Sequence, residues 1–208
     1  FGARRAQGPD AALLGARAAY IGGVASTSCT LSAMAYDMPA SGTMAHSWVQ
    51  MFDDEYTAFT TYCRLYPENA CLLIDTYNVL HSGLPNAIRA FKECGITNCS
   101  VRIDSGDIAY LTKKVREKLD SEGMEHCKIV ISNSLDEKII VDILRQGAQI
   151  DAFGVGERLI TAKSDPVFGG VYKLSAVEDE EGFVIPKIKI SENEGKITNP
   201  HFKILYRL

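Results

Sequence analysis

Short apolar segments alternate with helical patterns through the middle of the chain. The apolar segments are residues 71–75, 101–104, 128–132 and 152–156, and each one ends in polar or glycine residues. Their last residues are spaced by little more than the length of one helix and two loops, which suits repeated strand–helix–strand units. The pattern therefore predicts four short strands that follow one another in one sheet.

The segments between these strands predict helices. Apolar residues recur at three- and four-residue steps from 108 to 119 and again from 139 to 144, which is the periodicity of one helix face. Residues 86–93 form a third helical pattern, with a proline before it and a glycine after it. Nearly continuous apolar strands that alternate with helices are typical of a parallel sheet, so we expect an α/β fold with helices on its outer face.

The two ends of the chain differ from this middle part. The first 70 residues are predicted to be mostly helical, with helices near 11–20 and 54–66. After Gly169 the pattern predicts short strands at 171–177, 183–191 and 202–206, with turns at Glu181-Gly182 and Glu194-Gly195. We therefore predict a partial α/β catalytic domain over residues 1–170 and a β-rich segment of a second domain over residues 171–208.

Composition narrows the class of protein. The formal net charge of −4 argues against broad binding to the phosphate backbone of nucleic acid, so no nucleic-acid partner is expected. Six cysteines are scattered without CxxC spacing, which favours reduced thiols in a cytoplasmic protein over a zinc site. No apolar run is long enough for a membrane helix. The chain begins at Phe1 within motif-like sequence, and we interpret it as an interior fragment.

Polar and glycine residues follow each predicted strand, where parallel α/β folds collect their functional groups. They are Asp75, Asp104, Ser105, Gly106, Asp107, Ser132, Asn133, Ser134, Gly154 and Gly156. Such a set can bind sugar hydroxyls, a divalent cation and phosphate on one rim. Each member also has a structural alternative, because aspartate caps turns and helices and paired glycines form turns.

Three further positions carry candidate chemistry. His46 lies among small residues and is followed by Ser47, and its imidazole can act as acid, base or nucleophile near neutral pH. Arg4 and Arg5 offer two adjacent guanidinium groups that can clamp phosphate. Arg102 lies within an apolar strand and needs an anionic partner, which is either a carboxylate such as Asp75 or the carboxylate of a substrate.

The sequence resembles the nicotinate phosphoribosyltransferase family in seven segments along its whole length. In chain order these are FGARRAQGPD, GTMAHSW, LLIDTYN, VRIDSGD, ISNSLDE, FGVGE and GGVYKL. The resemblance implies an irregular parallel α/β barrel, as in type II phosphoribosyltransferases, with a second domain built from the chain ends. It also implies a reaction that joins nicotinate and phosphoribosyl pyrophosphate to nicotinate mononucleotide and pyrophosphate, assisted by ATP hydrolysis and Mg²⁺.

The resemblance carries roles over to individual residues. His46 is similar to the histidine that ATP phosphorylates transiently, and Asp75 to the acid that orients its imidazole. Arg102 resembles a contact to the pyridine substrate, and Asp104 a contact to the ribose hydroxyls. The aromatic residues that stack on the pyridine ring are expected upstream of Phe1.

The phosphate end of the site is implied in the same way. Arg4 resembles an arginine that meets the phosphates, and Ser132, Asn133 and Gly156 resemble contacts to the ribose and its 5′-phosphate. Glu157 departs from the family pattern, where a small hydroxyl residue is expected, and its carboxylate repels phosphate. Lys173 is the cation expected to offset it.

Several alternatives remain open from the sequence. A nicotinamide phosphoribosyltransferase on the same fold would differ in the base it takes. A quinolinate phosphoribosyltransferase would need more cationic residues for a diacid. An inactive homologue that serves as a nucleotide-binding partner, or an unrelated α/β barrel enzyme, would not turn over the phosphoribosyl donor. The resemblance also implies a homodimer for the full-length protein.

Overall fold

The computed structural model describes residues 1–167, 169–188, 190 and 197–206. The chain divides into two compact units, Phe1–Pro166 and Val167–Leu208, which are described separately below. No helix within the described residues combines the length and the apolar character that a membrane crossing requires.

A parallel sheet of four strands forms the centre of the first unit. Its strands are β1 (Ala70–Leu73), β2 (Cys99–Ile103), β3 (Lys128–Ser132) and β4 (Ala152–Gly154). The strands lie side by side in the order in which they occur in the sequence, and each neighbouring pair is parallel. The α/β fold with a parallel sheet is therefore confirmed, and all four strand ends point to one edge.

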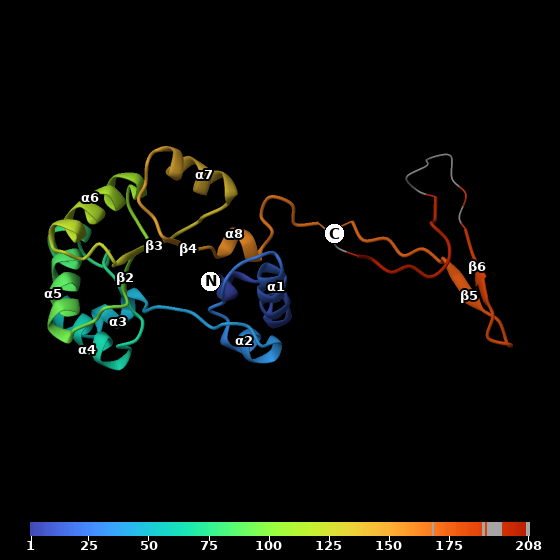
Figure 1. The fold of residues 1–208 in the computed structure, drawn as a ribbon, viewed down its shortest axis with the longest axis horizontal. Helices are drawn as coiled ribbons and strands as arrows, with labels where there is room; N and C mark the ends of the chain where they lie inside the picture. Colours follow the sequence, from blue (N-terminus) through green and yellow to red (C-terminus); the bar gives the residue numbers. More distant parts are fainter. Residues whose placement is uncertain (168, 189, 191–196, 207–208) are drawn as a thin grey trace. The chain divides into compact units, whose positions relative to one another are not determined.

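Helices cover the sheet from outside. Figure 1 shows α4 (Glu55–Leu65), α5 (Leu84–Cys94), α6 (Ile108–Ser121) and α7 (Glu137–Arg145) in an arc around the strands. A short π-helical segment, η2 (Val79–Gly83), leads into α5. α4, α5 and α6 bury residues of their apolar faces, and α7 packs its partly buried isoleucines against the same core, which lies between the helical arc and the sheet.

Local sequence explains where these helices begin. Asp54, Asp107 and Asp136 are the residues before α4, α6 and α7, and each side chain accepts a hydrogen bond from a backbone N–H three residues later. This is the N-cap geometry, in which a carboxylate satisfies an N–H that lacks a helical partner. The caps of α6 and α7 place the start of these two helices directly after the ends of β2 and β3, so the loops at this edge are short.

The core of the first unit is apolar and tightly buried. Val101, Ile103, Ile129 and Ile131 in the two central strands are completely buried. Each such side chain contributes about 1.5–3 kcal/mol relative to an exposed one. Arg102 interrupts this pattern as the only residue of β2 that is not fully buried, and it lies next to the cavity described below.

A second group of helices comes from both ends of the first unit. Figure 1 shows α1 (Pro9–Ile21), α2 (Thr30–Tyr36) and α8 (Glu157–Ile160) close together beside the amino terminus. The short helix η1 (Ala3–Arg5) packs against α1 and α8, whereas α3 (His46–Gln50) lies beside α4 (Figure 1). The chain thereby brings its first residues against the segment that follows β4.

The second unit contains one antiparallel pair of strands, β5 (Ala176–Glu178) and β6 (Val184–Pro186). They are joined through a turn at which Gly182 adopts a φ of 86°. The prediction of a strand at 202–206 is wrong, since these residues form no regular structure. The predicted turn at Glu194-Gly195 lies outside the described residues, as does part of the strand predicted at 183–191.

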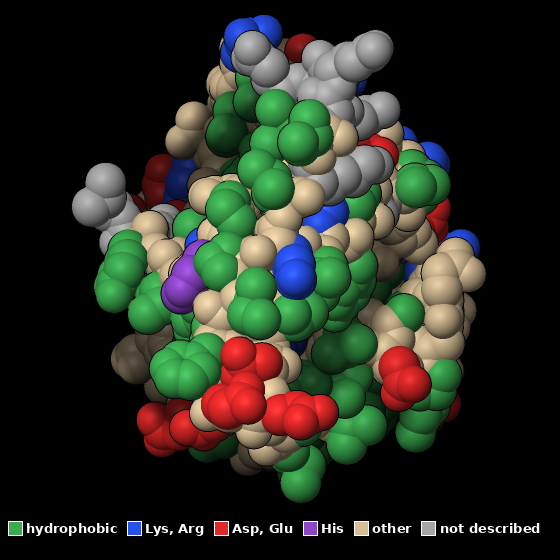
Figure 2. Space-filling view, turned by 90° about the vertical axis from the view of Figure 1, so that its right-hand side faces the viewer, with side chains coloured by type: hydrophobic (Ala, Val, Ile, Leu, Met, Phe, Trp, Pro, Cys, Tyr) green, Lys and Arg blue, Asp and Glu red, His purple; other side chains and the backbone are tan. Residues whose placement is uncertain are grey.

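Many large apolar side chains of the second unit are exposed. Tyr172, Phe202 and Leu205 are among the most exposed, and Figure 2 shows a face of the molecule on which hydrophobic side chains gather. The predicted strand at 202–206 failed because an alternating apolar pattern forms a strand only where a neighbouring strand and a core receive it.

Candidate active site

The polar ends of the strands and the first residues of the chain enclose one cavity of about 200 Å³. Its lining consists of Phe1, Gly2, Arg4, Arg5, Arg102, Asp104, Ser132, Asn133, Ser134, Gly154, Gly156 and Glu157. Nine of these residues were candidates from the sequence. The cavity lies at the carboxyl edge of the parallel sheet, where β2, β3 and β4 end.

Arg102 lies at the centre of a polar network in this cavity. Its Nε donates to Ser132 Oγ at 2.8 Å, and its Nη1 donates to the carbonyl oxygen of Met44 at 3.3 Å. Its Nη2 lies 3.5 Å from Asp104 Oδ1, which also accepts a hydrogen bond from Ser132 Oγ at 2.5 Å. The protein partner of this arginine is thus Asp104, and the pairing with Asp75 that the sequence left open is not formed.

These contacts hold the guanidinium in one orientation. The Arg102 side chain is only 12% exposed, and its partners come from the loop after β2, from the end of β3 and from the loop before α3. A planar guanidinium fixed in this way can form two parallel hydrogen bonds to a carboxylate. The cavity can therefore recognise an anionic planar ligand at this point.

Phe1 is a cavity residue that the sequence analysis did not identify. Its ring centroid lies 5.2 Å from the guanidinium carbon of Arg102, a cation–π contact. The expectation that aromatic residues at the site lie upstream of Phe1 is therefore incomplete, because Phe1 itself lines the cavity. The sequence feature that could have identified Phe1 as a site residue was its position next to Gly2 in the FGARR motif.

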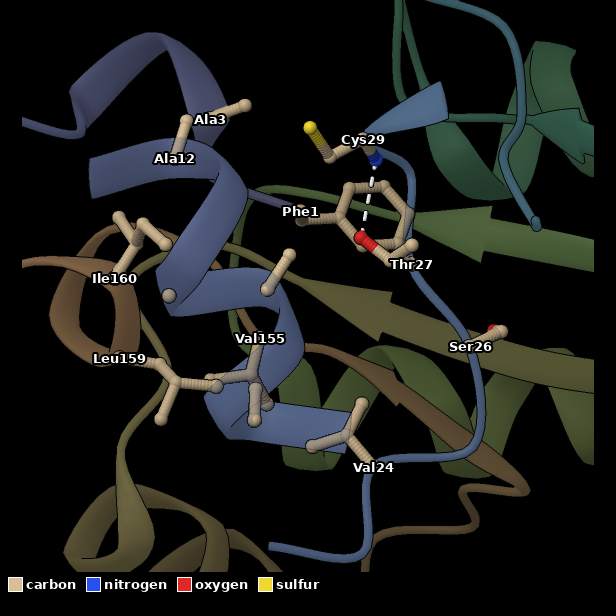
Figure 3. Close-up of a pocket in the computed structure, with 13 residues that line it drawn as sticks. Phe1, Ala3, Ala12, Val24, Ser26, Thr27, Cys29, Val155, Leu159 and Ile160 are labelled. Atoms are coloured by element: carbon tan, nitrogen blue, oxygen red, sulfur yellow. Dashed lines mark hydrogen bonds between the residues drawn. The ribbon is translucent and has the colours of Figure 1, made fainter. Parts of the chain in front are cut away.

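A second, smaller cavity lies behind the Phe1 ring. It measures about 30 Å³ and is lined mainly by apolar side chains of α1, α8 and the segment near Cys29. Figure 3 shows the Phe1 ring next to Cys29 and Thr27, while Val155 and the α8 residues Leu159 and Ile160 line the part of the cavity beside α1. Phe1 thus separates an apolar pocket from the polar one, and its ring is held between them.

His46 lies beside the two strand-end aspartates. Its Nε2 is 3.9 Å from Asp75 Oδ1 and 3.9 Å from Asp104 Oδ2. Its Nδ1 is 3.1 Å from Thr76 Oγ1, a partner that the sequence analysis missed because any hydroxyl in this loop was an equal candidate. Nε2 of the imidazole therefore faces two carboxylates, and Nδ1 faces a hydroxyl.

Asp75 is the most buried of the predicted catalytic residues. Its side chain is 1% exposed, and its Oδ2 accepts hydrogen bonds from the Asp104 N–H and the Ser105 hydroxyl at 3.1 and 2.5 Å. Its Oδ1 has no hydrogen-bond partner. A buried carboxylate oxygen without a partner is costly, and here it is directed toward the His46 imidazole.

Close backbone contacts shape the end of the cavity opposite Arg102. Gly2 has a φ of +93°, and a Cβ placed on it would lie 2.6 Å from the carbonyl carbon of Gly156. Only glycine fits there, for both conformational and steric reasons. Asn133 and Ser134 also have positive φ values of 98° and 49°, an unfavourable conformation that clusters at functional loops.

Two arginines and one carboxylate face each other at this end. Arg4 and Arg5 line the cavity from η1, and Glu157 lines it from the start of α8. Arg5 Nη1 lies 3.4 Å from Glu157 Oε2. The sequence analysis expected Lys173 to offset this carboxylate, whereas within the first unit the carboxylate pairs with Arg5.

The remaining predicted substrate contacts do not line the cavity. Ser47 is exposed in the first turn of α3, and Gly106 forms a turn with a φ of +87°. Ser105 bonds to Asp75 and Asp107 caps α6, so both support the loop rather than face the cavity. Lys173 belongs to the second unit.

Comparisons with known proteins identify the family of this chain. A model of the nicotinate phosphoribosyltransferase (NAPRTase) family matches residues 1–204. The chain belongs to the nicotinate phosphoribosyltransferase family. The resemblance of its seven segments to this family is thereby confirmed.

Individual members of the family show how much of a complete protein is present. The chain is 49% identical over 210 residues to the nicotinate phosphoribosyltransferase of Bacillus subtilis, and it covers 42% of that protein. It is 29% identical over 264 residues to the human enzyme, of which it covers 48%. The chain thus spans less than half the length of these curated relatives.

Solved structures in the family share the fold. Human nicotinic acid phosphoribosyltransferase matches 75% of the chain with a TM-score of 0.68 and 27% sequence identity, over 42% of its own length. A nicotinate-nucleotide pyrophosphorylase from Pyrococcus furiosus matches 78% of the chain with a TM-score of 0.66 and 30% identity, over 41% of its length. The α/β arrangement described above is therefore common to nicotinate phosphoribosyltransferases and to this pyrophosphorylase.

Proposed function

We propose that the full-length protein containing this chain is a nicotinate phosphoribosyltransferase. It would join nicotinate and phosphoribosyl pyrophosphate to nicotinate mononucleotide and pyrophosphate, with assistance from ATP. The observation that supports this most strongly is the immobilised Arg102 guanidinium, which shares a cavity with Asp104 and with the arginines of η1. Membership of the family supports the same assignment.

The base would bind beside Phe1 and Arg102. Nicotinate is a planar aromatic anion, so its carboxylate suits the guanidinium and its ring suits stacking on the Phe1 side chain. The 5.2 Å cation–π contact between these two side chains already aligns them. A neutral amide would gain less from the guanidinium, which favours nicotinate over nicotinamide.

The phosphoribosyl donor would bind along the rest of the cavity. Its phosphates would contact Arg4, Arg5 and the glycine backbone at Gly156, and its ribose hydroxyls would contact Asp104 and Ser132. Backbone N–H groups and guanidinium groups are the usual ligands of phosphate, and carboxylates accept hydrogen bonds from sugar hydroxyls.

In the proposed reaction the pyridine nitrogen attacks the anomeric carbon of the ribose. The bond from that carbon to the pyrophosphate oxygen breaks, and its electron pair leaves with pyrophosphate. The ribose carries positive charge in the transition state, and the Asp104 carboxylate would stabilise it. The arginines would stabilise the negative charge that develops on the leaving group.

ATP would act through His46. With a proton held on Nε2 by Asp75 and Asp104, the Nδ1 nitrogen can accept the terminal phosphoryl group of ATP, and the bond from phosphorus to the bridging oxygen of ADP breaks. A phosphohistidine next to Asp104 adds negative charge and hydrogen-bond acceptors at the mouth of the cavity. Its hydrolysis would couple ATP to the overall reaction.

Mg²⁺ fits this cavity as an ion carried by the phosphates. The described residues contain no group of three or more His, Cys, Asp or Glu side chains that could hold a metal ion. Asp104, which is 31% exposed, is the residue that would hold it, since Mg²⁺ commonly combines one or two carboxylates with phosphate oxygens and water. When bound, the ion supplies charge neutralisation for pyrophosphate.

The finer architecture is also part of the proposal. The four-stranded parallel sheet would form one portion of an irregular barrel, and the β-rich segment with its exposed apolar residues would belong to a second domain. Large exposed apolar surfaces are typical of interfaces, which supports burial against other parts of the full-length protein and a homodimer. A cytoplasmic location fits the free cysteines.

The test is a product assay on the full-length protein. We expect nicotinate mononucleotide from nicotinate and phosphoribosyl pyrophosphate, faster with ATP, and little product from nicotinamide or quinolinate. His46→Ala should abolish the stimulation by ATP and preserve slow turnover without it. Turnover of nicotinamide in preference to nicotinate, or donor binding without any turnover, would refute the assignment.

A further inference from the structure

Glu157 places a negative charge at the phosphate end of the cavity. Its Oε2 lies 3.4 Å from Arg5 Nη1, and both residues line the cavity together with Arg4 and Gly156. The carboxylate is 37% exposed and the guanidinium 51% exposed, so a ligand in the cavity can reach both. The Glu157 carboxylate thus already pairs with a guanidinium group that a phosphate would otherwise bind.

Close packing holds the two partners at this distance. Gly2, next to η1, contacts Gly156, next to α8, so closely that no Cβ fits between the two backbones. On the other side of α8 a Cβ on Gly15 of α1 would lie 2.4 Å from Ile160 Cδ1, and Figure 3 shows Ile160 beside Ala12 of α1. The helices that carry Arg5 and Glu157 are therefore held together by the backbone contact between Gly2 and Gly156, and the Ile160 side chain packs α8 against Gly15 of α1.

The neighbouring cation is already used elsewhere. Arg158 follows Glu157 in α8, and its Nη1 pairs with Asp136 Oδ2 at the start of α7. The backbone hydrogen bond from Ile139 and the hydrogen bond from Arg158 hold the pKa of Asp136 below its ordinary value. Arg158 therefore links α8 to α7, and the arginine that pairs with Glu157 is Arg5.

These contacts have a consequence for ligands. A phosphate that reaches Arg5 competes with the Glu157 carboxylate for the guanidinium and remains close to the negative charge of that carboxylate. We propose, on the basis of the proposed function, that Glu157 is a specificity-determining residue, an internal anion that occupies Arg5 and weakens phosphate binding at this end. A neutral side chain of the same size at this position removes both effects.

The test measures binding of inorganic phosphate to the full-length protein, without added metal or base. Glu157→Gln should bind phosphate about tenfold more tightly than the parent protein, an order of magnitude expected for the removal of one like charge at the rim of a site. Glu157→Asp, which retains the charge, serves as the control and should remain within about threefold of the parent. In an Arg5→Ala background, the increase in phosphate affinity caused by Glu157→Gln should be less than half of the increase measured with Arg5 present. The reason is that the cation for which Glu157 and phosphate compete is then absent.

The result that would overturn the inference is equal or weaker phosphate binding by Glu157→Gln while its thermal unfolding matches that of the parent. Absence of phosphate binding in both proteins would overturn it as well. If Glu157→Gln loses stability, Glu157→Thr provides the same comparison with a shorter neutral side chain. Nicotinate turnover is measured separately, so failure of the proposed function and failure of this inference give different outcomes.

Discussion

Replacement of Gly2 by alanine should damage the cavity much more than it destabilises the rest of the protein. Gly2 has a φ of +93°, and a Cβ there would lie 2.6 Å from Gly156 C and 2.8 Å from Gly156 O. A left-handed conformation costs a residue with a Cβ roughly 1–2 kcal/mol. Overpacking against a backbone that cannot rotate away adds about 1–3 kcal/mol.

The expected total is thus about 2–5 kcal/mol, and it is concentrated where η1 meets the segment before α8. The strain is relieved most easily if the two backbones move apart, which separates Arg4 and Arg5 from Gly156 across the cavity. We expect the dissociation constant of the full-length protein for phosphoribosyl pyrophosphate to rise by at least about tenfold, since 1.4 kcal/mol corresponds to a factor of ten.

Gly8→Ala is a matched control for this experiment. Gly8 has a similar φ of +99°, but a Cβ placed on it would meet no atom within 4 Å. Both variants place a Cβ at a positive φ, with ψ near −2° at Gly2 and 173° at Gly8, where a Cβ is disfavoured at least as strongly. Only Gly2→Ala adds the contact with Gly156. Binding by calorimetry and unfolding by denaturant on both variants would check the argument, and equal donor affinities for Gly2→Ala and Gly8→Ala would refute it.

Three other predictions follow from the same geometry. Arg102→Ala should raise the nicotinate KM by roughly 10–100-fold, because it removes a charge-assisted hydrogen bond to the carboxylate, and should change the KM of the donor by less than about threefold. Steady-state kinetics in which both KM values rise equally would contradict the carboxylate contact. Thr76→Val, which removes the hydroxyl beside the proposed phosphorylation site, should reduce the stimulation by ATP about threefold or more and leave ATP-independent turnover unchanged, and equal losses in both assays would argue against its role. Hydrogen bonds from Lys118 and Lys92 lower the pKa of Glu122 to about 2, so the stability it contributes is present above its ordinary pKa and is lost as the pH falls toward about 2. Glu122→Gln should flatten the dependence of the unfolding free energy on pH in this acid range, and an unchanged slope would show that the carboxylate contributes nothing.

The central fold was predictable because its signals are local. The apolar strands and the helix periodicities each lie within one short window of sequence, and the aspartate caps lie immediately before the helices they start. The strand predicted at 202–206 failed because strand formation depends on a partner that no local window contains. Local patterns thus predicted the parallel sheet and failed where partner surfaces decide the structure.

The candidate cavity was predictable in its members but not in its contacts. Strand-end position identified Asp104, Ser132 and Asn133, because parallel strands deliver their ends to one edge. The pairing of Arg102 with Asp104 in preference to Asp75 depends on side-chain directions that sequence spacing leaves open. The approach of Phe1 to Arg102 requires that the first residues return to the end of β4, and no pattern within the sequence encodes that distance.

The contact between Gly2 and Gly156 also orders the events of folding. The two residues lie near the two ends of the first unit in sequence, although they touch in the fold. The four strands, by contrast, pair only with their neighbours in the sequence. Each strand can join the sheet as soon as the ribosome has released it, but the chain closure between η1 and the end of β4 carries the largest loop entropy and comes late. A nascent chain would therefore form most of this core before the cavity is complete, and Arg4 and Arg5 would reach their positions only after β4 has emerged.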